Sequence, residues 1–235
     1  MNVRVLIISL CMALAVSPAF GGEKAELKTQ KDKVSYAIGV DMGNSLKKNS
    51  IDVDPELLVK GMRDALSGAK TLMTEQEVRE TLVAFQKEFQ AKQQEKMKAL
   101  AEKNKKEGDA FLAENKKKGG VKTLPSGLQY KVIKEGKGAS PKETDTVTVH
   151  YRGTLIDGTE FDSSYKRNEP ATFQVNGVIK GWTEALQLMK EGAKWQLFIP
   201  ANLAYGERGA GGVIGPNATL IFEVELIKIG AKESK

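Results

Sequence analysis

TVTVHYRGTLIDGTEFDSS, residues 146–164, has the pattern of a β-hairpin. In its first half the apolar side chains of Val147, Val149 and Tyr151 alternate with polar ones, which is the period of a strand that buries one face. The pair Asp157-Gly158 follows, and this pair favours a tight turn. The stretch therefore predicts two antiparallel strands joined by a short turn.

The same period recurs on both sides of the hairpin. The apolar residues of the further strands are Leu128, Tyr130, Val132, Ala193, Trp195, Leu197, Ile199, Leu220, Phe222, Val224 and Leu226. One short helix is expected at 182–190, where Trp182, Leu186 and Met189 share a face. A single helix against an antiparallel sheet with one polar face makes an α+β domain, which we place at residues 119–235.

Residues 23–73 read as short helices that form a separate region. Asp54 is placed to cap one of them, and Pro55 takes the first helical position, where its missing N–H costs nothing. Gly68 is placed to end that helix. So short a segment has little core of its own, and its apolar side chains need another surface to cover them.

A long connecting helix is expected over residues 74–118. Thr74 and Glu77 have the spacing of a capping box at its start. Its apolar stripe fades after Phe89 into Lys, Glu, Gln and Ala, which are strong helix formers. We interpret the second half as a spacer with no face to bury. The apolar first half has to be covered, and so we expect a homodimer formed through residues 23–89.

The layout of residues 1–21 is that of a secretory signal peptide. The apolar run VLIISLCMALAV, residues 5–16, follows the positive charge of Arg4 and is too short to span a bilayer comfortably. Cys11 lies inside the run and does not follow a small residue, so we reject a lipoprotein. We expect an exported, periplasmic protein with no membrane anchor, and we leave association with the outer surface open.

Composition excludes several classes of function. After signal cleavage no cysteine would remain, which excludes disulfides, thiol catalysis and Cys-ligated zinc. His150 is the only histidine, so no poly-His metal site can form, and its place on the polar face of a strand argues against a catalytic role. The net charge is +6, but the lysine-rich residues 87–118 lack the interleaved aromatics of a nucleic-acid surface. We expect no cofactor, no metal and no nucleic-acid partner.

The C-terminal half resembles the FK506-binding protein (FKBP) family of peptidyl-prolyl cis–trans isomerases. The resemblance runs from about residue 124 to 229 and is carried by VHYRGTL (149–155), DGTEFDSS (157–164), VIKGW (178–182), IP (199–200), AYG (204–206) and IGPNATLIFEVEL (214–226). In the N-terminal half, VSYAIG (34–39) and GMRDA (61–65) resemble the dimerisation region of the Mip-like (macrophage infectivity potentiator) branch. Members of that branch are exported V-shaped homodimers with long connecting helices.

This resemblance implies an isomerase that assists the folding of exported proteins. Its partners would be proline-containing polypeptides, and FK506- and rapamycin-type compounds would inhibit it. The pocket would be lined by Tyr151, Phe161, Asp162, Phe173, Val178, Ile179, Trp182, Tyr205 and Phe222. Of these, the implied catalytic set is Tyr151, Asp162, Ile179 and Tyr205, and the other five would bind substrate.

The resemblance also implies a role for each group. Trp182 would form the floor under the proline ring, and the Ile179 N–H and the Tyr205 hydroxyl would donate hydrogen bonds to substrate carbonyls. Asp162, the one charge in an apolar wall, would hold neighbouring polar groups and orient the twisting amide. No bond is broken, because the reaction is rotation over a barrier of about 18–20 kcal/mol. An apolar pocket favours the twisted transition state, since water stabilises the charge-separated planar amide.

Two departures from the family pattern and two other functions stay open. Ala171 stands where the family often has an aromatic residue, and Ala210 stands where it has a bulky or polar one; we expect both at the pocket rim, within reach of a mobile flap at 206–212. One alternative function is a holdase that binds unfolded chains in the helical cleft, with incidental isomerase activity. The other, an inactive proline-binding adaptor, would require pocket losses beyond these two.

Overall fold

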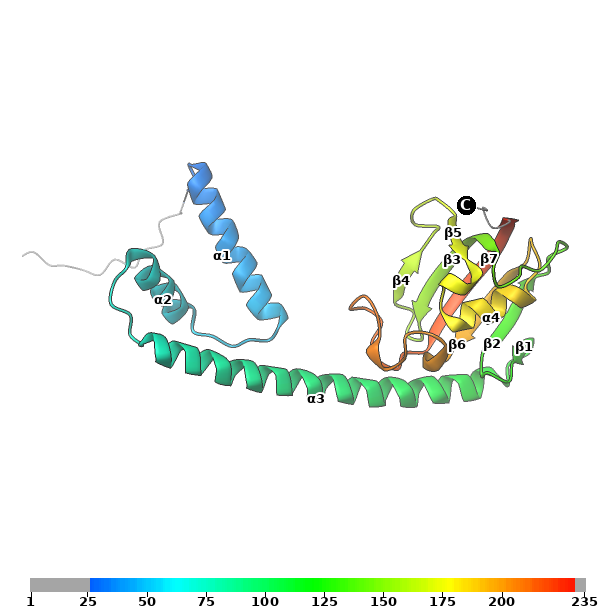
Figure 1. Ribbon diagram of the computed structural model, residues 1–235, viewed down its shortest axis with the longest axis horizontal. Helices are drawn as coiled ribbons and strands as arrows, with labels where there is room; N and C mark the ends of the chain where they lie inside the picture. Colours follow the sequence, from blue (N-terminus) through cyan, green and yellow to red (C-terminus); the bar gives the residue numbers. More distant parts are fainter. Residues whose placement is uncertain (1–25, 231–235) are drawn as a thin grey trace, which may run out of the picture. The chain divides into compact units, whose positions relative to one another are not determined.

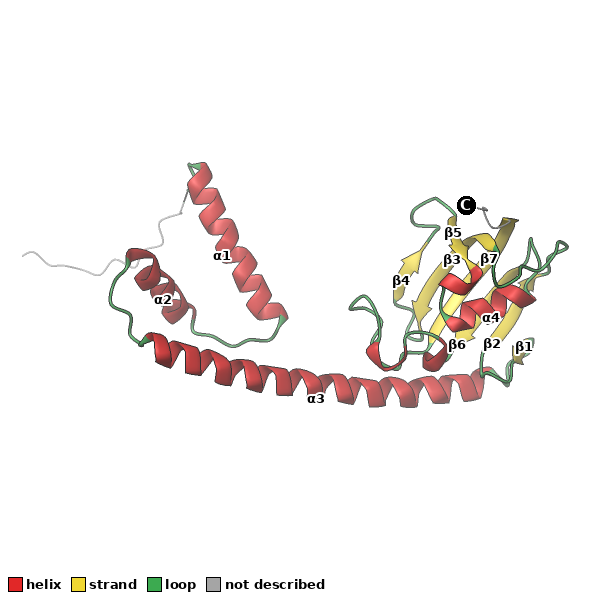
Figure 2. Cartoon of the chain, viewed as in Figure 1, coloured by secondary structure: helices red, strands yellow, loops and turns green. Residues whose placement is uncertain are grey.

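The computed structural model describes residues 26–230, so the expected signal peptide at 1–21 lies outside the described residues. The chain divides into two compact units between Thr74 and Glu75. The first is helical, and the second holds a long helix and an antiparallel sheet (Figures 1 and 2). The expected α+β class is therefore confirmed.

The first unit contains two helices, α1 (Gln30–Lys48) and α2 (Pro55–Ser67). The carboxylate of Asp54 accepts hydrogen bonds from the amides of Glu56 and Leu57 at 2.8 and 3.1 Å, and so caps α2 as predicted. Gly68 ends the helix in the left-handed conformation, at a φ of 68°. No residue of α1 is buried within the described chain, so this unit leaves its apolar side chains exposed.

The long helix α3 (Glu75–Asn115) begins directly after Thr74 and ends three residues before the expected boundary at 118. Its second half was expected to be a spacer, and this prediction was wrong. Gly108 and Asn115 are buried, and Asn104 and Phe111 on the same face are half-buried. This face packs against the sheet domain, as the ring of Phe111 lies 5.9 Å from that of Phe198.

Within the described residues the strands form one seven-stranded sheet, ordered β1-β2-β6-β7-β3-β4, with β5 also paired to β3. The strands are β1 (Val121–Thr123), β2 (Gln129–Lys134), β3 (Thr146–Leu155), β4 (Glu160–Ser163), β5 (Ala171–Gln174), β6 (Lys194–Ile199) and β7 (Leu220–Gly230). Every strand pair is antiparallel. The predicted hairpin is β3 and β4, closed by a hydrogen bond from the amide of Leu155 to the carbonyl of Thr159.

The two faces of this sheet are covered by different helices. Helix α4 (Lys180–Leu188) packs on one face, where an ideal Cβ at Gly181 would lie only 2.5 Å from Ile199. The other face was expected to be polar, but Phe198 and Gln129 on it are both buried. Because successive strand residues point to opposite faces, Phe198 faces away from α4, and the end of α3 covers it.

Candidate active site

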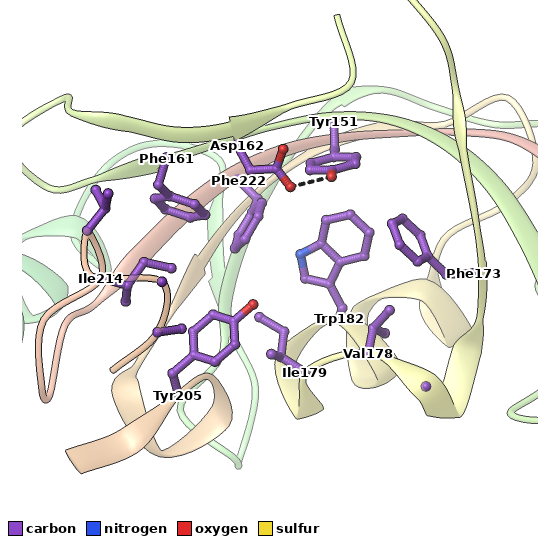
Figure 3. Close-up of a pocket in the computed structure, with 14 residues that line it drawn as sticks. Tyr151, Phe161, Asp162, Phe173, Val178, Ile179, Trp182, Tyr205, Ile214 and Phe222 are labelled. Carbon is purple, nitrogen blue, oxygen red and sulfur yellow. Dashed lines mark hydrogen bonds between the residues drawn. The ribbon is translucent and has the colours of Figure 1, made fainter. Parts of the chain in front are cut away.

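A cavity of about 590 Å³ opens between α4, the sheet and the loop before β7 (Figure 3). All nine residues named from the sequence line it. Ala210, expected at the rim, lines it too, and the structure adds four more lining residues, which are Gly177, Gly211, Val213 and Ile214. In Figure 3 Phe161 and Ile214 lie on one side of the cavity, and Trp182, Phe173 and Val178 lie on the other.

Trp182 is the centre of an aromatic cluster within the cavity. Its ring meets those of Tyr151, Phe173 and Phe222 at centroid distances of 5.3, 5.9 and 5.2 Å, each close to perpendicular. Phe161 meets Phe222 in the same way at 5.4 Å. Edge-to-face contacts of this kind favour one fixed arrangement of rings. Trp182 is only 4% exposed, and so the aromatic wall of the cavity is closely packed.

Gly153 allows two of these rings to approach the sheet. It lies in β3, opposite Asp162 of β4 and Phe222 of β7. An ideal Cβ there would lie 2.6 Å from Phe161 and 2.7 Å from Phe222, far inside normal contact distance. The absence of a side chain at this position therefore gives the two rings the space they occupy.

One carboxylate stands in this apolar wall, and two residues hold it. Asp162 Oδ2 accepts a 2.5 Å hydrogen bond from the Tyr151 hydroxyl, and Oδ1 accepts one from Arg167. Arg167 also donates to the Tyr151 oxygen at 2.8 Å, which closes a three-residue network. Sequence reasoning missed Arg167, because it lies in a polar loop with no periodic pattern.

The network keeps Asp162 ionised and Tyr151 neutral. Partial burial would raise the pKa of Asp162, but the hydrogen bonds from Tyr151 and Arg167 and the charge of Arg167 outweigh it, and the pKa lies below its ordinary value. Burial, together with the hydrogen bond to Asp162, raises the pKa of Tyr151. The carboxylate is therefore a fixed negative charge at neutral pH.

Two donors at the cavity are available to a ligand. Ile179 is the N-cap of α4, and among residues 26–230 no acceptor pairs with its backbone N–H. Tyr205 is 41% exposed and turns its ring toward the cavity, with the hydroxyl at the inner end (Figure 3). Both groups are therefore positioned to donate hydrogen bonds to carbonyls of a bound peptide.

The loop between η3 (Gly206–Arg208) and β7 forms the remaining wall. Ala210 and Ile214 exchange backbone hydrogen bonds of 2.8 and 3.0 Å, which fold the loop into a small hairpin. Ala210 lines the cavity as expected, but Ala171 does not. Ala171 instead pairs with Val149 within the sheet and packs on the core, so its small side chain does not shape the cavity directly.

Two further aromatic residues, His150 and Trp195, lie outside the cavity lining. His150 stacks on Tyr165 with ring centroids 4.7 Å apart, and its Nδ1 lies 3.0 Å from the Ser164 hydroxyl. Trp195 is buried in the core and stacks on Tyr130 at 4.3 Å. Neither side chain is among those that line the cavity.

Comparison with known proteins places the chain in a family. Residues 31–132 match the domain amino-terminal to FKBP-type peptidyl-prolyl isomerase, and residues 137–227 match the FKBP-type peptidyl-prolyl cis–trans isomerase domain. The chain belongs to the FKBP-type isomerases. This FKBP is also 53% identical over 225 residues to the outer membrane protein MIP of Legionella longbeachae, covering 95% of this chain and 97% of the relative.

Further relatives place this FKBP in the Mip-like branch. The peptidyl-prolyl cis–trans isomerase Mip of Coxiella burnetii is 54% identical over 206 residues, covering 88% of this chain and 90% of the relative. The crystal structure of FkpA from Escherichia coli matches with a TM-score of 0.68 at 43% identity, covering 88% of this chain and 99% of the other. The expected enzyme class and the order of helical region, long helix and antiparallel sheet are thereby confirmed.

Proposed function

We propose that this FKBP isomerises X-Pro bonds of exported polypeptides in the cavity around Trp182. The observation that carries the proposal is the perpendicular packing of aromatic rings around Trp182, with a single held carboxylate in the wall. The proline ring rests on Trp182, and the apolar walls remove water from the prolyl amide. Desolvation destabilises the planar amide relative to the twisted one, and so lowers the rotation barrier.

The polar groups of the cavity orient the peptide. The Ile179 N–H and the Tyr205 hydroxyl donate hydrogen bonds to carbonyls on either side of the proline. The Asp162 carboxylate fixes the Tyr151 hydroxyl and stabilises the amide as it twists. The hydrogen bonds from Tyr151 and Arg167 hold this charge in a fixed position, so it needs no reorganisation as the amide twists. FK506- and rapamycin-type compounds would occupy the same apolar space.

A matched pair of tryptophan substitutions tests this assignment. Trp182→Phe replaces the indole ring at the cavity floor with a smaller ring. Trp195→Phe makes the same change at a buried tryptophan outside the cavity. We expect Trp182→Phe to lower kcat/KM for a proline peptide and to weaken FK506 binding, and Trp195→Phe to lower only thermal stability. Equal isomerase activity in the two variants would refute the role of Trp182.

We also propose that the protein is a homodimer through residues 23–89. Large apolar side chains project from all three N-terminal helices, such as Ile38 of α1, Leu57 of α2 and Leu82 of α3, which are 55, 61 and 60% exposed. Apolar faces of this extent mark association surfaces in soluble proteins. Sedimentation of the full chain at micromolar concentration should give a dimer, and a monomer would remove the proposal.

Export to the periplasm is a further part of the proposed function. It is supported by the apolar run at residues 5–16 and by the name of the Legionella longbeachae relative, an outer membrane protein. In the part of the chain that the structure describes, no helix is long and apolar enough to cross a membrane. N-terminal sequencing of the cell-derived protein tests export: a mature chain that starts near residue 22 supports it, and an uncleaved one opposes it.

A second candidate function is a holdase that binds unfolded chains along the helical region. The exposed apolar side chains of α1 and α2 favour it. Full-length Asp162→Ala distinguishes the two functions, because Asp162 lies in the cavity wall and outside the helical region. If it suppresses aggregation of a denatured client as well as the wild type does, the holdase function is independent of isomerisation. If suppression falls together with isomerase activity, the cavity performs both.

A further inference from the structure

The second half of α3 contacts the loop that forms one wall of the cavity. Asn104 Nδ2 of α3 donates a 2.8 Å hydrogen bond to the carbonyl oxygen of Pro216. At the preceding residue, an ideal Cβ on Gly215 would lie 2.9 Å from Asn104 Nδ2 and 3.2 Å from Leu100. Helix and loop therefore meet at two successive loop residues, through a hydrogen bond at Pro216 and a close approach at Gly215.

The contacted segment, residues 209–217, is the cavity's loop wall. Its residues Ala210, Gly211, Val213 and Ile214 all line the cavity. Within the described chain, its backbone hydrogen bonds to itself and its base are few: the Ala210–Ile214 pair, a bond from Ala218 to Gly215, and one from Asn217 to Gly206 at 2.8 Å. Its tip at 211–213 is exposed, whereas Ile214 packs into the core and Pro216 is buried. The backbone of the segment between these anchors has few partners of its own, so a hydrogen bond from α3 contributes to its position.

Helix α3 is itself firmly attached next to this contact. Asn115, which is 1% exposed, donates to Gln129 at 2.9 Å, and Gln129 in turn donates to the carbonyl of Leu112 at 2.9 Å. Gly108 approaches Thr219 so closely that an ideal Cβ would lie 2.3 Å from the threonine hydroxyl. Asn104 thus projects from a rigid support, one helical turn before Gly108.

We propose that Asn104 is a positioning residue for substrate binding. With Leu100, it holds residues 209–217 in the substrate-ready position from the helix side. Pro216 is two residues from Ile214, so a shift of its carbonyl moves the Ile214 wall of the cavity. Because coupling between two sites is reciprocal, occupancy of the cavity also tightens the attachment of the loop to α3. This proposal rests on the proposed function, since it takes the cavity as the proline site.

Two full-length variants test the proposal by kinetics. Asn104→Ala removes the donor to Pro216, and Lys106→Ala changes an exposed side chain on the outward side of the same helix. With a proline peptide, Asn104→Ala should raise KM about 3- to 10-fold, the range for one net hydrogen bond. Its kcat should stay within about twofold, because the aromatic wall and Asp162 are untouched. Lys106→Ala should match the wild type in both constants.

Methyl NMR gives a readout that does not depend on turnover. Asn104→Ala should shift the Ala210 and Ile214 methyl signals and leave that of Ile199 in place, and saturating FK506 should reduce the shift. An active wild type with unchanged KM and unchanged loop signals in Asn104→Ala would overturn the positioning role. So would a variant in which thermal stability and apparent kcat fall while KM stays unchanged, since a smaller folded fraction lowers kcat alone and marks a merely structural residue. A wild type with no isomerase activity would instead refute the proposed function.

Discussion

Replacing Gly153 with alanine tests whether the cavity depends on the space that this glycine leaves. Gly153 has no positive φ, so alanine fits its backbone and only packing changes. The new Cβ would lie 2.6 Å from Phe161 and 2.7 Å from Phe222, whereas carbon atoms prefer roughly 3.5–4.0 Å. Both rings must therefore withdraw by about 1 Å. Overpacking of this kind costs about 1–3 kcal/mol of unfolding free energy.

The displaced rings are the ones that line the cavity, so activity should fall even where the variant remains folded. We expect kcat/KM for a proline peptide to fall by about tenfold to a hundredfold, as for misplacement by 1 Å in other active sites. The assay is peptide exchange at a temperature where thermal denaturation shows the variant to be folded. Gly119→Ala is the control, since no atom lies within 4 Å of its added Cβ. Wild-type kcat/KM in folded Gly153→Ala would refute the reasoning.

Two further substitutions probe the electrostatic network and the attachment of α3. The pKa of Asp162 in the folded protein lies below its ordinary value of 3.8. The stability that the ionised carboxylate contributes is therefore fully present above pH 3.8, and it is lost as the pH falls through the lower pKa of the folded state. At neutral pH the wild type should therefore have a higher urea midpoint than Asp162→Asn, and the difference between the two midpoints should shrink as the pH is lowered. A difference that does not change with pH would contradict this. Gln129→Ala leaves the buried Asn115 amide without its partner and should cost about 1–3 kcal/mol in urea unfolding. Gln196→Ala, at a half-buried position of β6, should cost clearly less, and equal losses would oppose the account.

The strands and the cap of α2 follow from local signals in the sequence. Alternation around Tyr151 places its strand, and the Asp54-Pro55 pair starts α2, because these effects act within a few residues. The nine cavity residues were found through the family resemblance. Hydrophobic periodicity alone does not distinguish Trp182 and Phe222 at a cavity from Trp195 in the core, since all three are buried aromatic side chains.

The attachment of α3 was missed for a physical reason. Its contact face mixes the apolar Leu100 and Phe111 with Asn104, Gly108 and Asn115, so no continuous apolar stripe marks it in the sequence. A glycine that permits close approach and amides that pair with Gln129 look like solvent-exposed positions until the partner is known. For the same reason Arg167 went unnoticed, because only its contact with Asp162 gives it a role.

The most direct test of the central claim is the cis–trans interconversion rate of an Ala-Leu-Pro-Phe peptide, measured by exchange NMR. The samples are wild type, Asp162→Ala, and wild type with FK506. Our account predicts that wild type accelerates interconversion, and that both the substitution and the drug reduce the acceleration. A folded wild type that does not accelerate interconversion would contradict the assignment of isomerase activity to this cavity.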